Sequence, residues 1–130
     1  MLKDWLARRY GGRRDAGSID VGIAAIVAIT LVFGLIQAGL WFHGRSVAAH
    51  AAQQGVDAGR SHNAAPGAAQ SAAEDFLSRM RDTLPTSTVS VQREGAQQVA
   101  VTVQGETVSL IPGMPLSVEQ RVQAPVEEWR

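Results

Sequence analysis

The hydrophobic pattern of this chain begins with a long apolar segment, Val21–Phe42, that contains no charged residue. As a helix rising about 1.5 Å per residue, this segment would be roughly 33 Å long, and the hydrocarbon core of a bilayer is about 30 Å thick. A buried core helix is the alternative, but the rest of a 130-residue chain offers too few large apolar side chains to surround one. The pattern therefore predicts a transmembrane helix over residues 18–42.

The same helix is predicted to continue beyond the membrane over residues 43–60, which are rich in alanine and contain no proline. Small residues recur there at every fourth position, at Ala51, Gly55 and Gly59. One small residue in each helical turn lets another helix approach closely. We therefore expect a helix extension with a packing row, followed by a loop at residues 61–67, where Gly, Ser, Asn and Pro gather.

Residues 68–130 predict a small extracytoplasmic α+β domain. Apolar residues three and four positions apart indicate an amphipathic second helix from Ala68 to Leu84, which Pro85 would end. Apolar and polar residues then alternate, as in strands that are buried on one face only. The alternating segments are Thr88–Arg93, Gln98–Val103 and Leu116–Val122. The predicted fold class is α+β: a long N-terminal transmembrane helix continuing outside the membrane, a second amphipathic helix and a small three-stranded antiparallel sheet.

Charge is balanced overall but not along the chain. The 12 basic and 12 acidic residues cancel, which argues against a nucleic-acid-binding protein. Before the span, basic residues outnumber Asp4 and Asp15. These basic residues are Lys3, Arg8, Arg9, Arg13 and Arg14. Because basic residues beside a span stay in the cytoplasm, residues 1–17 are predicted to form a basic cytoplasmic leader. The expected localisation is the cytoplasmic membrane, crossed once, with the C-terminal domain outside.

The sequence carries no recognisable catalytic chemistry. It has no cysteine, no Gly-rich phosphate-binding loop and no metalloprotease or serine-hydrolase motif. Two of its three histidines, His43 and His50, could share a helix face, but no carboxylate or thiolate accompanies them at ligand spacing. We therefore expect no enzymatic activity, no cofactor and no metal site. Without disulfides, the exported domain must fold by packing alone or with a partner.

Small and polar residues within the span are candidate helix-packing positions. Gly34 and Ala38 permit close backbone approach, and the Gln37 amide needs a hydrogen-bonding partner in apolar surroundings. One interpretation is that these residues contact another membrane helix. The other is that Gln37, near the end of the span, reaches the lipid headgroups.

A glycine lies at the junction between the basic leader and the apolar helix, at Gly17–Ser18. This arrangement resembles the precursors of the type IV pilin-like family, which are cut on the cytoplasmic side directly after a glycine. The resemblance implies a prepilin-type peptidase as a processing partner and Ser18 as the first mature residue. A signal peptidase site is the alternative, because Ala49-His50-Ala51 fits the Ala-x-Ala pattern, but the apolar run is about twice as long as a signal peptide's hydrophobic region.

More narrowly, the chain resembles the TadE-like pseudopilins of tight-adherence (Flp-type) pilus systems. The resemblance rests on Gly17–Ser18, on the end of the apolar span from Phe33 to His43, and on the run Ala51-Ala52-Gln53-Gln54-Gly55. It implies a minor pseudopilin-like structural or assembly component of a tight-adherence pilus or a related secretion apparatus. The implied partners are membrane lipid, other pilin-like subunits and pilus or secretion platform proteins.

One feature departs from the family pattern. Pilin-like precursors carry a glutamate at the fifth mature position, thought to neutralise the amino terminus of a neighbouring subunit; with Ser18 first, that position is Gly22. The nearby Asp20 lies about 200° away around the helix. The departure favours a scarce or terminal subunit over a main filament subunit. It also supports an alternative function, an uncleaved single-pass membrane-anchored binding module that docks another envelope protein.

Overall fold

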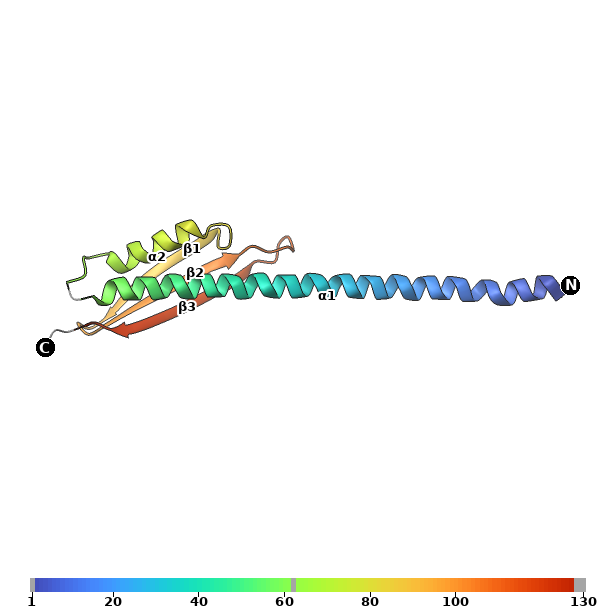
Figure 1. Ribbon diagram of the computed structural model, residues 1–130, viewed down its shortest axis with the longest axis horizontal. Coiled ribbons are helices and arrows are strands. Elements are labelled where there is room, and N and C mark those ends of the chain that lie inside the picture. Colours follow the sequence, from blue (N-terminus) through green and yellow to red (C-terminus); the bar gives the residue numbers. More distant parts are fainter. Residues whose placement is uncertain (1, 62, 128–130) are drawn as a thin grey trace. The chain divides into compact units, whose positions relative to one another are not determined.

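The computed structural model describes residues 2–61 and 63–127. In chain order it contains α1 (Leu2–Arg60), α2 (Ala68–Arg79), β1 (Thr86–Glu94), β2 (Gln98–Thr107) and β3 (Leu116–Pro125) (Figure 1). The predicted α+β class is confirmed: a long apolar N-terminal helix, a second helix and a three-stranded antiparallel sheet. The arginines of the predicted leader, at positions 8, 9, 13 and 14, lie outside the side chains that the structure describes.

The chain divides into two compact units, Met1–Ile36 and Gln37–Arg130, and α1 contributes residues to both. In the first unit, the large apolar side chains between Ile19 and Ile36 are exposed. The Thr30 hydroxyl donates a hydrogen bond to the Ile26 carbonyl oxygen at 2.8 Å, which satisfies a polar group within the apolar segment. Within the described residues, α1 is the one helix that is long and apolar enough to cross a membrane. Because its apolar window is not buried by the chain, the alternative of a soluble core helix is not supported.

The second unit is built on the sheet, whose strand order is β1-β2-β3. Val101 at the middle of β2 pairs with Val91 of β1 and Val122 of β3. Side chains alternate across a strand, so Val99, Val101 and Val103 share one face, and all three are buried. The opposite face carries mostly polar side chains, as in an antiparallel sheet with one face in water.

Both helices of the second unit cover the apolar face of the sheet (Figure 1). The register along β2 shows that α1 runs antiparallel to this strand: Gly44 lies against Thr107, Gly55 against Val101 and Gly59 against Val99. The buried residues that α1 contributes are small: Val47, Ala48, Ala51, Ala52 and Val56. Helix α2 adds Ala69, Ala73 and Leu77 to the same core. Small side chains on both helices allow close packing over the sheet.

The second helix is shorter than expected. It ends at Arg79, with Met80 as its C-cap, whereas the sequence pattern suggested that it would continue to Leu84. A turn follows, in which the Thr83 and Leu84 N–H groups both donate to the Met80 carbonyl oxygen, at 3.0 and 2.9 Å. This turn brings Leu84 into the core, where it is 1% exposed. Burial of Leu84 between α1 and the central strand β2 therefore outweighs continuation of the helical pattern.

The strands are longer than expected, by two or more residues at several ends. β1 begins at Thr86 and pairs with β2 through Thr86↔Glu106, while β3 extends to Pro125 through Gln98↔Pro125. Pairing with the central strand supplies backbone hydrogen bonds that short sequence patterns do not reveal. The predicted turn between the first two strands is present, with Gly95 at a φ of 70°, a conformation that favours glycine.

Candidate functional site

The predicted processing junction lies at the start of the apolar segment. Gly17 and Ser18 are helical and exposed, and a side chain added at Gly17 would meet nothing within 4 Å in the chain. Glycine is therefore not required at position 17 by packing within this chain. The pilin-like resemblance places a peptidase cut directly after this glycine.

The small-residue row of the helix extension packs within the chain. A Cβ at Gly55 would lie 3.0 Å from the Ala69 carbonyl oxygen and 3.1 Å from a Val101 methyl group. A Cβ at Gly59 would lie 2.9 Å from the Ala69 Cβ, and Ala51 is fully buried. The helix that approaches this row is thus α2 of the same chain. A partner subunit could reach these three residues only if that packing opened.

Gly44 lies seven residues before Ala51 on α1, and it was not predicted from the sequence to be a packing position. A Cβ at Gly44 would overlap the Thr107 methyl group, and Thr107 is 5% exposed. The signal was present in the sequence, because Gly44, Ala48 and Ala52 are four residues apart. The sequence did not predict that Thr107, at the C-terminal end of β2, would lie against Gly44.

The Gln37 amide finds its partners in the loop between β2 and β3. Gln37 Nε2 donates to Ser109 Oγ at 3.1 Å, and the Leu110 N–H donates to Gln37 Oε1 at 2.9 Å. These bonds join residues 72 and 73 positions apart in the sequence. The two interpretations of Gln37 from the sequence were another helix and the headgroups. The structure instead gives the amide a partner in its own domain.

An aromatic and basic cluster follows one turn later on α1. Trp41 is half-buried against the core, and its Nε1–H donates to the Ser117 carbonyl oxygen at 3.2 Å. Its ring contacts Phe42 edge-on at 5.1 Å between centroids, and the Arg45 guanidinium lies 5.5 Å from the Trp41 ring centroid. Trp and Tyr side chains with one polar and one apolar end are typical of a membrane interface. The position of Trp41 suits both this setting and the domain core.

Two other predicted packing residues, Gly34 and Ala38, are exposed in the described part of the chain. A Cβ added at Gly22 or at Gly34 would meet nothing within 4 Å, and Ala38 is exposed. Of the six predicted packing positions, Gly34 and Ala38 are therefore the two whose surroundings within the chain are open.

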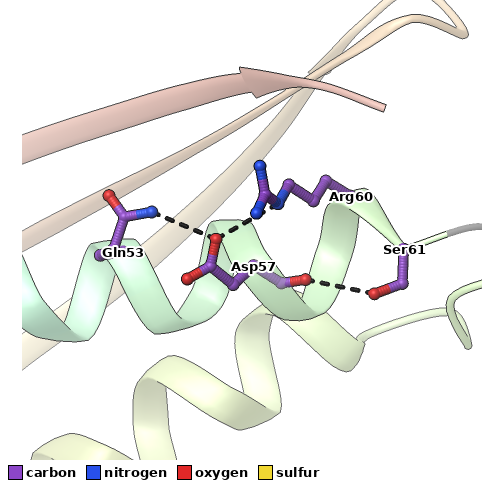
Figure 2. Close-up of polar contacts among 4 residues, drawn as sticks. All are labelled: Gln53, Asp57, Arg60 and Ser61. Carbon is purple, nitrogen blue, oxygen red and sulfur yellow. Dashed lines mark hydrogen bonds and ion pairs between the residues drawn. The ribbon is translucent and has the colours of Figure 1, made fainter. Parts of the chain in front are cut away.

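The C-terminal end of α1 is held by a polar cluster around Asp57 (Figure 2). Asp57 Oδ1 accepts a hydrogen bond from Gln53 Nε2 and forms an ion pair with Arg60 Nε, both at 3.2 Å. The Ser61 hydroxyl donates to the Asp57 carbonyl oxygen at 3.3 Å, and the Glu127 N–H donates to the Arg60 carbonyl oxygen at 3.0 Å. These bonds satisfy carbonyl groups that a helix end leaves free. The cluster thus terminates the helix, and its exposed ion pair adds little stability.

Within residues 2–61 and 63–127, no group of three His, Cys, Asp or Glu side chains is close enough to hold a metal ion.

A comparison with known protein families gives a match within α1. Residues 16–57 match the model of the TadE-like protein family. The chain is TadE-like over this segment, which confirms the resemblance read from the sequence. The match includes the Gly17–Ser18 junction, the apolar segment and most of the small-residue row, and it ends before α2 and the sheet. The TadE-like family is associated with the tight-adherence pilus as a structural component. Neither a curated protein nor a solved structure matches the chain.

Proposed function

We propose that this protein is a minor pseudopilin-like structural and assembly component of a tight-adherence pilus or a related secretion apparatus. The observation that carries the proposal is the TadE-like match over residues 16–57, which contains both the Gly17–Ser18 junction and an apolar segment whose large side chains are exposed from Ile19 to Ile36. A helix of this kind is stable in lipid, where its backbone hydrogen bonds are satisfied internally.

The proposed placement is the cytoplasmic membrane, with residues 1–17 in the cytoplasm and the α+β domain outside. Basic residues before the apolar segment support this orientation. A prepilin-type peptidase would cut between Gly17 and Ser18 and leave the apolar helix at the mature amino terminus.

Contacts with partners would run through the open surface of the membrane helix at Gly34 and Ala38. The row at Ala51, Gly55 and Gly59 is occupied by α2, so the membrane segment is the better candidate for binding pilin-like subunits or a platform protein. Gly22, in place of the family's glutamate, supports a scarce or terminal position over a repeating one.

The test is co-purification from a host that encodes the pilus machinery, with the chain tagged at its C-terminus. Gly34→Ile should reduce the recovery of pilin-like partners several-fold, because the added side chain prevents close helix approach. Gly39→Ile is the matched control: position 39 is equally open in the chain and lies about 140° away around the helix. Both variants should be expressed at the level of the parent protein.

Three outcomes would contradict the proposal. The chain could be the main repeating subunit of purified filaments, or both variants could retain every partner. The chain could also keep its leader and co-purify with an envelope protein unrelated to pili. This last result would favour the alternative function, an uncleaved membrane-anchored binding module, which the glycine at position 22 also supports.

A further inference from the structure

The loop between β2 and β3, residues 108–115, exposes a group of apolar side chains. Val108, Leu110, Ile111 and Met114 are 41%, 44%, 46% and 55% exposed. The sequence contains no charged residue between Glu106 and Glu119. Neighbouring apolar side chains exposed at one end of a domain mark an interaction surface. The outward face of the sheet carries mostly polar side chains, whereas the side chains exposed by this loop are mostly apolar.

Gln37 of α1 holds this loop in place. Its amide oxygen accepts from the Leu110 N–H at 2.9 Å, and its amide nitrogen donates to the Ser109 hydroxyl at 3.1 Å. Ser109 Oγ also accepts from the Ile111 N–H at 3.2 Å. The exposed apolar group is therefore fixed beside a residue that lies inside the apolar segment Val21–Phe42.

The position of Gln37 along the helix sets the level of the loop relative to a membrane. Trp41, Phe42 and Arg45 form an aromatic and basic cluster, and tryptophan is enriched at membrane–water interfaces. Gln37 precedes Trp41 by one helical turn, or about 6 Å along the axis. Amphipathic helices that lie in a membrane surface bury their apolar face about 5–10 Å into the headgroup and acyl boundary, which gives the depth scale for interfacial apolar side chains. The loop is at the level where its apolar side chains would meet that boundary.

Several backbone polar groups of the loop are satisfied within the chain. Pro112 and Pro115 have no N–H group to satisfy. The N–H groups of Leu110 and Ile111 are bonded to side chains, and that of Met114 donates to the Ile111 carbonyl oxygen at 3.3 Å. Because lipid-exposed irregular backbone does not occur within the hydrocarbon core, the loop would lie at the headgroup and acyl boundary, where water still reaches its remaining polar groups.

We propose that the loop 108–115 inserts into the outer leaflet of the membrane, with Gln37 fixing its depth, and that phospholipid is its partner. The protein would then contact the bilayer at two places, the apolar helix and this loop, and the domain would be restrained against the membrane surface. The proposal rests on the membrane segment and does not depend on a role in a pilus.

The test uses the full chain in nanodiscs of phosphatidylcholine and phosphatidylglycerol, which leave both membrane faces open to solvent. The sequence has no cysteine, so Ile111→Cys and Met114→Cys each give a single site for an environment-sensitive fluorophore. Ala96→Cys is the matched control, because it is exposed in the turn at the other end of β2. Labels at positions 111 and 114 should be quenched several-fold less by aqueous iodide than the label at position 96. They should also be quenched by lipids carrying a shallow nitroxide.

Equal iodide quenching at the three positions would overturn the proposal. The apolar side chains of the loop would then be expected to bind a protein partner instead of lipid. The role of Gln37 is tested with Gln37→Leu, which keeps the span apolar and removes both bonds to the loop. This variant should raise iodide quenching at position 111 several-fold, whereas Gln54→Leu, an exposed glutamine farther along α1, should not. An unchanged signal in Gln37→Leu would overturn the assignment of loop depth to this residue.

Discussion

The glycines of α1 fall into two groups that the sequence alone does not separate. Gly22 and Gly34 have open space around them, whereas Gly44, Gly55 and Gly59 lie against β2 and α2. Glycine within a helix costs about 1 kcal/mol relative to alanine. In the second group this cost is offset by close packing of the helix over the sheet. Around Gly22 and Gly34, as around Gly39, no described residue lies close enough to offset this cost by packing.

Gly44→Ala should destabilise the folded domain by about 1–3 kcal/mol, because the new methyl group would overlap the Thr107 side chain in a packed core. Without the overlap, the change would stabilise the helix by up to about 1 kcal/mol. Gly39→Ala is the control, since position 39 has open space and should be neutral or stabilising. The measurement is thermal unfolding of the full chain in detergent, followed by circular dichroism.

The identity of the overlapping group can be checked directly. Thr107→Ser removes the methyl group that a Cβ at position 44 would meet, and it keeps the hydroxyl that donates to the Leu116 carbonyl oxygen at 3.5 Å. In the Gly44→Ala background, this second change should restore part of the lost stability. If Gly44→Ala alone were as stable as Gly39→Ala, the packing of α1 against the end of β2 would be wrong.

The central strand β2 connects the elements of the folded domain. It pairs along its whole length with β1 and β3, and its inward side chains Val99 and Val101 lie against α1. Helix α2 covers the β1 side, where the Gln70 amide donates to the Val89 carbonyl oxygen at 3.4 Å. With mostly alanine and valine in the core, each larger side chain contributes a substantial share of the buried apolar area.

Val101→Ala should lower the free energy of unfolding by about 2 kcal/mol, because two buried methyl groups are lost beneath the helices. Ser90→Ala is the control on β1, where the side chain is exposed, and it should change stability by less than about 0.5 kcal/mol. Chemical denaturation of both variants measures the difference. Equal effects would mean that the helices do not cover this face of the sheet.

For the chain as a whole, the proposed orientation places the leader in the cytoplasm and the domain outside. A reporter enzyme fused after the C-terminal domain should be active only outside the cytoplasm, and one fused before Gly17 only inside, because the basic residues precede the apolar segment. Extraction of the intact chain should require detergent. The reverse reporter pattern would contradict the orientation, and release by salt alone would contradict the membrane segment itself.

Processing of the leader is a separate prediction. In a host that has a prepilin-type peptidase, mass spectrometry should find a mature chain beginning at Ser18. Gly17→Leu should block this cut, since the family's cut follows a glycine, and the open space around Gly17 means that the fold should tolerate leucine. Gly39→Leu should be processed normally. A chain beginning at Ala52 would instead show use of the Ala49-His50-Ala51 site.

The elements were largely predictable because each has a local period or length. The apolar run, the amphipathic second helix and the three alternating segments could each be read from fewer than about 25 neighbouring residues. The errors arose at boundaries. Leu84 leaves the helical pattern to enter the core, and β3 extends to Pro125 through pairing with Gln98. Both outcomes depend on residues distant in the chain.

By itself the sequence determined the apolar segment, the order of helices and strands, and the family resemblance, because these depend on neighbouring residues. Tertiary structure alone decided which surfaces are occupied. It placed α2 against the row at Gly55, brought Thr107 to Gly44, and gave Gln37 partners 72 and 73 positions away. Such contacts form when the β2–β3 hairpin packs back along α1. Patterns among neighbouring residues do not predict contacts between residues so far apart in the sequence. The same folding brings the apolar loop 108–115 beside Gln37, near the end of the apolar segment.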